Sequence, residues 1–310
     1  MKRVILIIST ALLISSIALG FTEKSIQGEI ITSFEIGMGK EQIPNFEYEG
    51  GAYYSPKSFF VDENNNYIIY IHEPNEVKRF SPEGNLIDSY DLSKVSNKIV
   101  SIYYNSEREL VYALTNESLI YILDNNYEVK GQINISNAKK YLKPHLLDNI
   151  KVLGEQIYVY TGQKLLKVMS NGDEANIEKV DGFLNLDKDV EKIFVNTRKI
   201  DDTQYYVIKY KSKEEFALQL PSRDGLVYFI KQKNENIYFY IGKTGLYDAH
   251  EITPIIGIIN KSHQSSFVTL RGEKLVGGFG FEILVDIDKK GNIYNLCKEG
   301  NKIVVYRYTI

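Results

Sequence analysis

The fold is decided by a stretch that reads Phe59-Phe60-Val61-Asp62-Glu63-Asn64-Asn65-Asn66-Tyr67-Ile68. The apolar residues before Asp62 and the aromatic and β-branched residues from Tyr67 onward predict two strands, because such side chains suit a pleated, half-buried surface. The Asp and Asn residues between them are typical of turns, since their side chains accept hydrogen bonds from the nearby backbone and tolerate left-handed conformations. The stretch therefore predicts a β-hairpin.

The same pattern returns near the end of the chain without a gap. Val285-Asp286-Ile287-Asp288 leads into Gly291-Asn292-Ile293-Tyr294, and each residue follows its counterpart by 226 positions, as 285 follows 59. The match continues into a third predicted strand in both copies. The matched residues there are Asn75, Val77 and Phe80 in the first copy and Asn301, Ile303 and Tyr306 in the second.

Weaker echoes of the second strand lie between the two copies, at spacings that average about 45 residues, which suits a four-stranded propeller blade. Six such units predict an all-β chain that forms a six-bladed β-propeller of four-stranded antiparallel blades. A seven-bladed ring and an open sandwich are the alternatives. The echoes are Leu110-Val111-Tyr112, Gln156-Ile157-Tyr158, Gln204-Tyr205-Tyr206 and Asn236-Ile237-Tyr238.

The two ends of the chain complement each other. The last copy supplies three predicted strands before Ile310, which would leave one sheet edge unpaired. Residues 29–36, with Ile30, Thr32, Phe34 and Ile36 at alternating positions, form a predicted strand that is left over near the other end. We therefore expect this N-terminal strand to complete the last blade and close the ring.

Composition limits the classes of function. The 310 residues are 44% hydrophobic and 25% charged, as in a globular protein. The formal charge of −3 lacks the basic excess that binds a phosphate backbone, so we expect no nucleic-acid partner. The single cysteine, Cys297, excludes an intramolecular disulfide and a zinc site built from cysteines.

The first twenty residues are typical of a secretory signal peptide. Lys2 and Arg3 precede the apolar residues 4–19, and Ala18-Leu19-Gly20 suits signal peptidase. An uncleaved anchor is the alternative, but this run is short for a hydrocarbon core of about 30 Å. We expect residues 1–20 to be removed and residues 21–310 to form one propeller domain, periplasmic or extracellular, with no membrane span.

The two copies resemble blades of NHL-type six-bladed propellers. Such a blade has Pro before its first strand, as Pro56 is here, then Asp-x-x-Gly-Asn-Ile-Tyr at the turn, as from Asp288 to Tyr294, and later an Asn, a basic residue and an aromatic residue. The four middle units match only in outline. His72 stands where the family usually has Asp, as does Cys297 in the last blade, so the family's use of that Asp between blades does not carry over.

In this topology, the connections between second and third strands and those between blades lie at the same end of the ring. Aromatic and charged residues on converging loops are typical of a recognition surface, although ordinary solvated loops have a similar composition. Asp224, Lys298 and Glu299 fall at this end. The candidate ligand-binding residues are Tyr53, Tyr54, His72, Glu73, His145, Arg223 and Phe279.

An enzyme is the alternative to a binding protein. Amidating lyases and gluconolactonase-like hydrolases, which this chain resembles, hold a metal in the propeller channel through His or carboxylate ligands. The His residues here form no His-x-His pair, and no nucleophile and base can be paired, so we assign no catalytic residue, metal or cofactor. The turns at Asp62 and Asp286 look superficially like calcium loops but lack the closing Glu, so we interpret them as ordinary turns.

The sequence thus predicts an exported, non-enzymatic scaffold that binds a protein, peptide or glycan through one loop-rich face. The main alternative is a metal-dependent lyase or lactone hydrolase with its site in the central channel. A third possibility is a structural component of the cell envelope.

Overall fold

The computed structural model describes residues 22–23, 26–47, 53–140, 149–153, 155–161, 164–170, 175–180, 194–200, 203–210, 214–219, 226–242, 254–260, 265–273, 275 and 284–310. The chain divides into two compact units. The first comprises Met1–Ser25 and Gly182–Thr269, and the second comprises Ile26–Asp181 and Leu270–Ile310.

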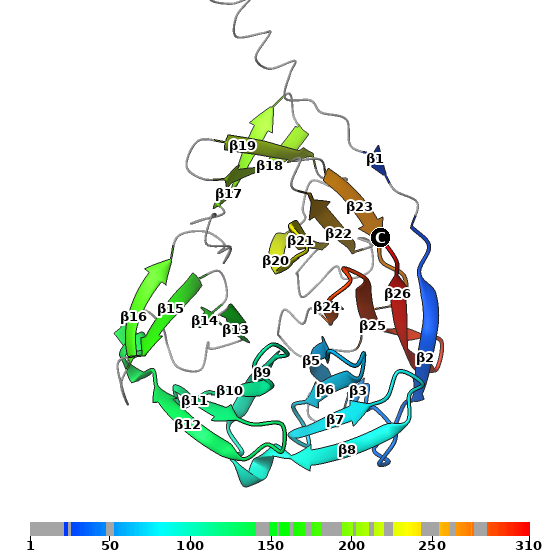
Figure 1. Ribbon diagram of the computed structural model, residues 1–310, viewed down its shortest axis with the longest axis vertical. Helices are drawn as coiled ribbons and strands as arrows, with labels where there is room; N and C mark the ends of the chain where they lie inside the picture. Colours follow the sequence, from blue (N-terminus) through cyan, green and yellow to red (C-terminus); the bar gives the residue numbers. More distant parts are fainter. Residues whose placement is uncertain are drawn as a thin grey trace, which may run out of the picture. The chain divides into compact units, whose positions relative to one another are not determined.

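The second unit contains four four-stranded antiparallel sheets, each an up-and-down meander (Figure 1). Three of them are continuous in sequence, and the fourth combines an N-terminal strand with the last three strands of the chain. The sheets are β5 (Pro56–Val61), β6 (Tyr67–Ile71), β7 (Glu76–Phe80) and β8 (Leu86–Asp91); β9 (Ile99–Asn105), β10 (Leu110–Thr115), β11 (Leu119–Leu123) and β12 (Val129–Asn134); β13 (Asn149–Leu153), β14 (Gln156–Thr161), β15 (Lys164–Ser170) and β16 (Ala175–Val180); and β2 (Glu29–Glu35), β26 (Lys302–Tyr308), β25 (Ile293–Glu299) and β24 (Val285–Ile287).

The first strands of these sheets are neighbours, in the order β24, β5, β9 and β13. Each sheet then runs outward from its first strand, as blades of a propeller do (Figure 1). Four short elements lie in the connections between blades. They are the paired strands β3 (Phe46–Glu47) and β4 (Tyr53–Tyr54), and the 3-10 helices η1 (Leu92–Lys94) and η2 (Ser136–Lys140).

The first unit contains two sheets. One has three described strands, and the other is a four-stranded antiparallel meander to which the short β1 (Thr22–Glu23) adds in parallel. The three-stranded sheet comprises β17 (Phe194–Ile200), β18 (Thr203–Tyr210) and β19 (Glu214–Gln219); the meander comprises β20 (Leu226–Lys233), β21 (Asn236–Gly242), β22 (Ile255–Ile259) and β23 (Ser265–Thr269).

The chain is an all-β propeller with five four-stranded antiparallel blades, so the prediction of six is wrong. The predicted second strands all exist, as β6, β10, β14, β18, β21 and β25. However, the structure describes three strands in the sheet that holds β18, namely β17, β18 and β19, so this second strand does not mark a four-stranded blade among the described residues. Counting second strands therefore counted hairpins rather than complete blades.

The expected pairing of the N-terminal strand is present. β2 pairs antiparallel with β26, from Glu29 opposite Arg307 to Glu35 opposite Lys302. Both of these cross-strand pairs are also ion pairs. The last blade of the second unit is thus built from both ends of the chain, which covers the edge that β26 would otherwise expose.

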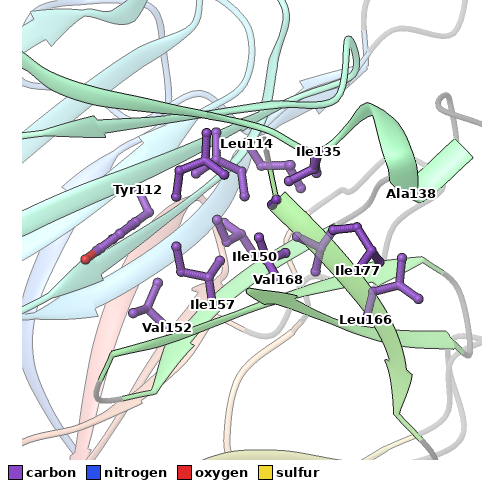
Figure 2. Close-up of a cluster of buried hydrophobic side chains, with 14 residues drawn as sticks. Tyr112, Leu114, Ile135, Ala138, Ile150, Val152, Ile157, Leu166, Val168 and Ile177 are labelled. Atoms are coloured by element: carbon purple, nitrogen blue, oxygen red, sulfur yellow. The ribbon is translucent and has the colours of Figure 1, made fainter. Parts of the chain in front are cut away.

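The core of the second unit lies in layers between successive blades. Figure 2 shows one layer, in which apolar side chains from β10 pack against those from β13, β14, β15 and β16. A second layer joins the β5–β8 blade to the β9–β12 blade. A third layer joins the β5–β8 blade to the blade that holds β24–β26. Because these side chains come from different blades, burying them fixes each blade against its neighbour.

The two sequence repeats share one hairpin and differ in the next. The first hairpins have the same register, with Val61 opposite Tyr67 and Ile287 opposite Ile293. The second hairpins differ by two residues, because Ile71 pairs with Glu76 in the first copy whereas Glu299 pairs with Lys302 in the second. The first copy therefore has a wider turn, residues 72–75, between its second and third strands.

The predicted signal peptide, residues 1–20, lies outside the described residues. Among those that the structure describes, no helix is long and apolar enough to cross a membrane.

Candidate functional site

The structure describes four of the seven predicted site residues. Tyr53 and Tyr54 form β4, and His72 and Glu73 lie in the turn between β6 and β7. Pro56 pairs with Ile71, so Tyr54 and His72 lie just beyond the same end of two adjacent strands. The other three, with Asp224, lie outside the described residues; they are His145, Arg223 and Phe279.

Tyr54 is held by a small sheet in the connection that precedes β5. β4 pairs antiparallel with β3, with Phe46 opposite Tyr54. The two rings stack with their centroids 5.4 Å apart, an arrangement that aromatic pairs favour. Tyr54 is therefore positioned on the end of the blade and remains partly exposed.

His72 is anchored through the hydroxyl of Tyr70. Nδ1 of His72 lies 3.2 Å from this hydroxyl, which also lies 3.0 Å from the carbonyl oxygen of Ile99 and 3.2 Å from Oδ1 of Asn75. Tyr70, Ile99 and Asn75 are buried, whereas His72 is partly exposed. The hydroxyl thus ties the turn of one blade to the first strand of the next.

Asn75 fixes the other end of the turn. It adopts a left-handed conformation with φ of 66°, which Asn tolerates better than most residues. Its side-chain Nδ2 donates a 2.8 Å hydrogen bond to the backbone carbonyl of Ser96. The backbone carbonyl of Asn75 accepts a 2.9 Å hydrogen bond from the backbone N–H of Leu92. These contacts bind the turn to the connection between β8 and β9.

The electrostatic surroundings favour a neutral imidazole at His72. Burial lowers its pKa from 6.5, and the positive charge of Lys57 acts in the same direction. The negative charge of Glu73 and the nearby backbone carbonyl of Ile99 oppose these effects but are weaker. At neutral pH the turn therefore presents an uncharged imidazole beside an exposed carboxylate.

The corresponding end of the last blade is built differently. Lys298 lies on β25, and its backbone exchanges two 2.8 Å hydrogen bonds with Glu273. The preceding residue, Cys297, is buried, and burial followed by the charge of Glu299 raises the pKa of its thiol to about 12. A buried thiol with this pKa is protonated at neutral pH and is a poor nucleophile.

Metal-ligating side chains do not gather in the part of the chain that the structure describes. No group of three or more His, Cys, Asp or Glu residues lies close enough there to hold a metal ion. The predicted calcium-like turns are explained by local bonding. Oδ1 of Asp62 accepts from the N–H groups of Asn64 and Asn66, and Oδ1 of Asp288 accepts from those of Lys290 and Asn292.

Sequence reasoning missed the residues that support His72. Asn75 stands out in the sequence only as a repeat position that matches Asn301, and Tyr70 was not singled out. A signal for Tyr70 was nevertheless present, because a buried Tyr hydroxyl needs a hydrogen-bond partner. The identity of that partner depends on the next blade, which the local sequence does not reveal.

No family model matches the sequence, and no match was found among curated proteins. A solved structure of a DUF4221 family member from Bacteroides vulgatus is 9% identical, with a TM-score of 0.53, over 93% of this chain and 99% of its own. A streptogramin B lyase is 13% identical over 92% and 98%, with a TM-score of 0.47. A virginiamycin B lyase from Staphylococcus aureus is 14% identical over 82% and 95%, with a TM-score of 0.42. At these identities the likeness concerns the fold alone, and that fold is a β-propeller.

Proposed function

We propose that this chain is an exported, non-enzymatic binding scaffold that recognises a protein or peptide through Tyr54, His72 and Glu73, called the loop face below. The observation that carries the proposal is the buried network beneath His72. Its hydrogen bonds at Tyr70 and Asn75 join two blades and fix a turn whose residues 73 and 74 are exposed. A preformed turn loses little conformational entropy when a partner binds.

The composition of the loop face supports a protein or peptide partner. It combines an aromatic ring, a neutral imidazole and a carboxylate, with the cation Lys57 close enough to influence His72. Such a mixture of charges and aromatic groups suits a polypeptide surface, which offers both signs of charge. A glycan partner is a separate outcome of the experiment below.

We also propose that the propeller is a divergent member of the NHL type. Support comes from the first hairpins of the two copies, which share register and turn bonding. In both, the side chain of the first turn residue accepts from the backbone N–H groups two and four residues later. Export is proposed from the charged and apolar pattern of residues 1–20.

The experiment is a capture from the envelope fraction by immobilised protein, followed by cross-linking and mass spectrometry. The test variant combines Tyr54→Ala and Glu73→Ala. The matched control combines Glu63→Ala and Glu83→Ala, which alter exposed residues in the turns at the opposite end of the same blade. We expect the wild type and the control to capture and cross-link to the same polypeptide, and the test variant to lose it.

Equal capture by the test variant would place the partner elsewhere and contradict the proposal. Capture that disappears after the partner fraction is treated with glycosidase, but survives protease treatment, would indicate a glycan and also contradict it. Thermal unfolding of both variants must match the wild type, so that lost capture reports on the surface rather than on folding.

A further inference from the structure

The hydroxyl of Tyr70 has more acceptors around it than it can serve. A Tyr hydroxyl donates one hydrogen and accepts through its lone pairs. The carbonyl oxygen of Ile99 and Oδ1 of Asn75 lie 3.0 Å and 3.2 Å away, and both are acceptors only. The amide of Asn75 cannot be turned over to donate to Tyr70 instead, because its oxygen would then face the carbonyl oxygen of Ser96, to which Nδ2 donates at 2.8 Å.

This inventory decides which ring nitrogen of His72 carries the hydrogen. If Nδ1 were an acceptor, three acceptors would compete for a single hydroxyl hydrogen in a buried place, which is costly. If Nδ1 carries a hydrogen, it donates to the lone pair of the Tyr70 hydroxyl, and that hydroxyl donates onward. The 3.2 Å separation between Nδ1 and the hydroxyl oxygen suits this role.

The other ring nitrogen is then an acceptor. In a neutral imidazole with a hydrogen on Nδ1, Nε2 holds a lone pair and no hydrogen. No described residue hydrogen-bonds to Nε2, and the His72 side chain is partly exposed, so Nε2 is the ring nitrogen left to meet a partner. Within the loop face, His72 thus offers an uncharged acceptor beside the acceptor Glu73.

We propose that Nε2 of His72 accepts a hydrogen bond from an N–H or O–H group of the peptide partner, and that protonation of His72 abolishes this bond and releases the partner. The inference rests on the proposed function and specifies the chemistry that the loop face recognises. A protonated imidazole donates from both nitrogens, so a donor on the partner would meet another donor.

The charged groups around His72 determine how this response varies with pH. Among the described residues, Lys57 on β5 and Glu73 in the same turn act on it, together with the hydroxyl of Tyr70 on β6 and the Ile99 carbonyl on β9. Lys57 disfavours a second positive charge, whereas Glu73 favours one. Above about pH 6.5 the imidazole is neutral and ready to accept; in more acidic solution it becomes a donor.

The first test needs no partner. Long-range proton–nitrogen correlation spectra of protein labelled with 15N-histidine distinguish the two tautomers, and the signals of His72 are those absent from His72→Asn. We expect the hydrogen on Nδ1 at about pH 7.5. A hydrogen on Nε2 would overturn the inference whatever the partner proves to be.

The second test uses peptides selected from a random-sequence phage library on the immobilised wild type, after depletion on the variant that combines Tyr54→Ala and Glu73→Ala. Two substitutions separate the two ring nitrogens. The amide nitrogen of His72→Asn lies near the position of Nδ1 and can still donate to Tyr70, but nothing replaces Nε2. The amide oxygen of His72→Gln can reach the position of Nε2 and accept there at any pH.

We expect the peptide to bind the wild type more weakly at about pH 5 than at about pH 7.5, by up to about tenfold, the size of one lost hydrogen bond. His72→Asn should bind about tenfold more weakly at both pH values, and His72→Gln should bind with little pH dependence. Wild-type affinity in His72→Asn, or the same pH dependence in His72→Gln as in the wild type, would overturn the inference. Failure to enrich any peptide would count against the proposed function itself, while the spectra still decide the tautomer.

Discussion

Gly28 lies against the ring of Tyr308, next to the point where the N-terminal strand joins the last blade. A β-carbon built at Gly28 would come 2.5 Å from Cε1 of Tyr308 and 2.7 Å from its Cζ. The Tyr308 ring cannot easily move, because it is fully buried and its hydroxyl accepts a 2.7 Å hydrogen bond from the backbone N–H of Arg271. The missing side chain at Gly28 is therefore what lets the two ends of the chain approach.

Gly28→Ala should lower the free energy of unfolding by about 1–3 kcal/mol, the usual cost of forcing extra atoms into a packed site. Urea unfolding followed by far-ultraviolet circular dichroism measures this change. The control is Gly131→Ala on the outer strand β12, where the new β-carbon would lie 3.7 Å from Cδ1 of Ile122, an ordinary contact. Equal stability of the two variants would contradict the close packing at Tyr308.

Phe34→Ala should weaken the attachment of β2 to the last blade. Phe34 is 3% exposed and its ring centroid lies 4.6 Å from that of Phe80, so its truncation removes contacts in the layer between two blades. We expect a loss of about 3–5 kcal/mol in the free energy of unfolding. Ile30→Ala on the same strand is the control, because Ile30 is 50% exposed and its truncation should change stability by less than about 0.5 kcal/mol.

The pairing of β2 could be predicted from sequence, whereas the number of complete blades could not. A single free edge at the end of the chain specifies the partner of residues 29–36. Their alternation predicts the buried face only in part, because Thr32 and Phe34 are buried whereas Ile30, beyond an irregularity in the register, is 50% exposed. The repeat copies also predicted the first hairpins correctly. They did not reveal the two-residue difference in the second hairpins, because a shift of two keeps every side chain on its original face and leaves the pattern of apolar residues intact.

Lys78→Met should destabilise the protein although it removes a charge from a buried position. Nζ of Lys78 donates to the carbonyl oxygens of Gly39 and Gln42 at 3.0 Å and 2.8 Å. Methionine fills similar space but leaves those carbonyls without this donor, so we expect a loss of about 1–3 kcal/mol in unfolding free energy. Lys302→Met, which removes an exposed ion pair with Glu35, should cost less than about 1 kcal/mol. Equal losses would contradict a specific role for Lys78.

Calcium and chelator should leave the melting temperature unchanged. Both carboxylate oxygens of Asp62 and of Asp288 are occupied by donors within their own turns, including the side-chain amides of Asn66 and Asn292 at 2.8 Å. A cation would have to displace these bonds. Differential scanning fluorimetry with excess Ca²⁺ and with EDTA measures the effect, and a calcium-dependent rise in melting temperature would contradict the interpretation of these segments as turns. Asp62→Ala, in contrast, should lower stability by about 1–3 kcal/mol, because its turn donors lose their acceptor.

The candidate site was predictable in its exposed part only. His72 and Glu73 were placed correctly on a turn, because a turn must interrupt two adjacent apolar strands. What fixes His72 is the hydroxyl of Tyr70, whose partner Ile99 lies 29 positions later on another blade. Such a contact depends on how two blades pack, and no local pattern of residues encodes it.

The stability of the wild type should depend on pH through His72 in a way that His72→Asn lacks. Burial gives His72 a pKa below its ordinary 6.5 in the folded protein, whereas the unfolded chain keeps the ordinary value. As the pH falls below about 6.5, the unfolded state takes up a proton before the folded state does, so the folded state loses stability until its own lower pKa is passed. Urea unfolding at a series of pH values should therefore show the wild type losing more stability on acidification than His72→Asn, while both behave alike above about pH 7.5. The carboxylates titrate in both proteins and cancel in the comparison, so parallel curves over the whole range would mean that His72 carries no such shift.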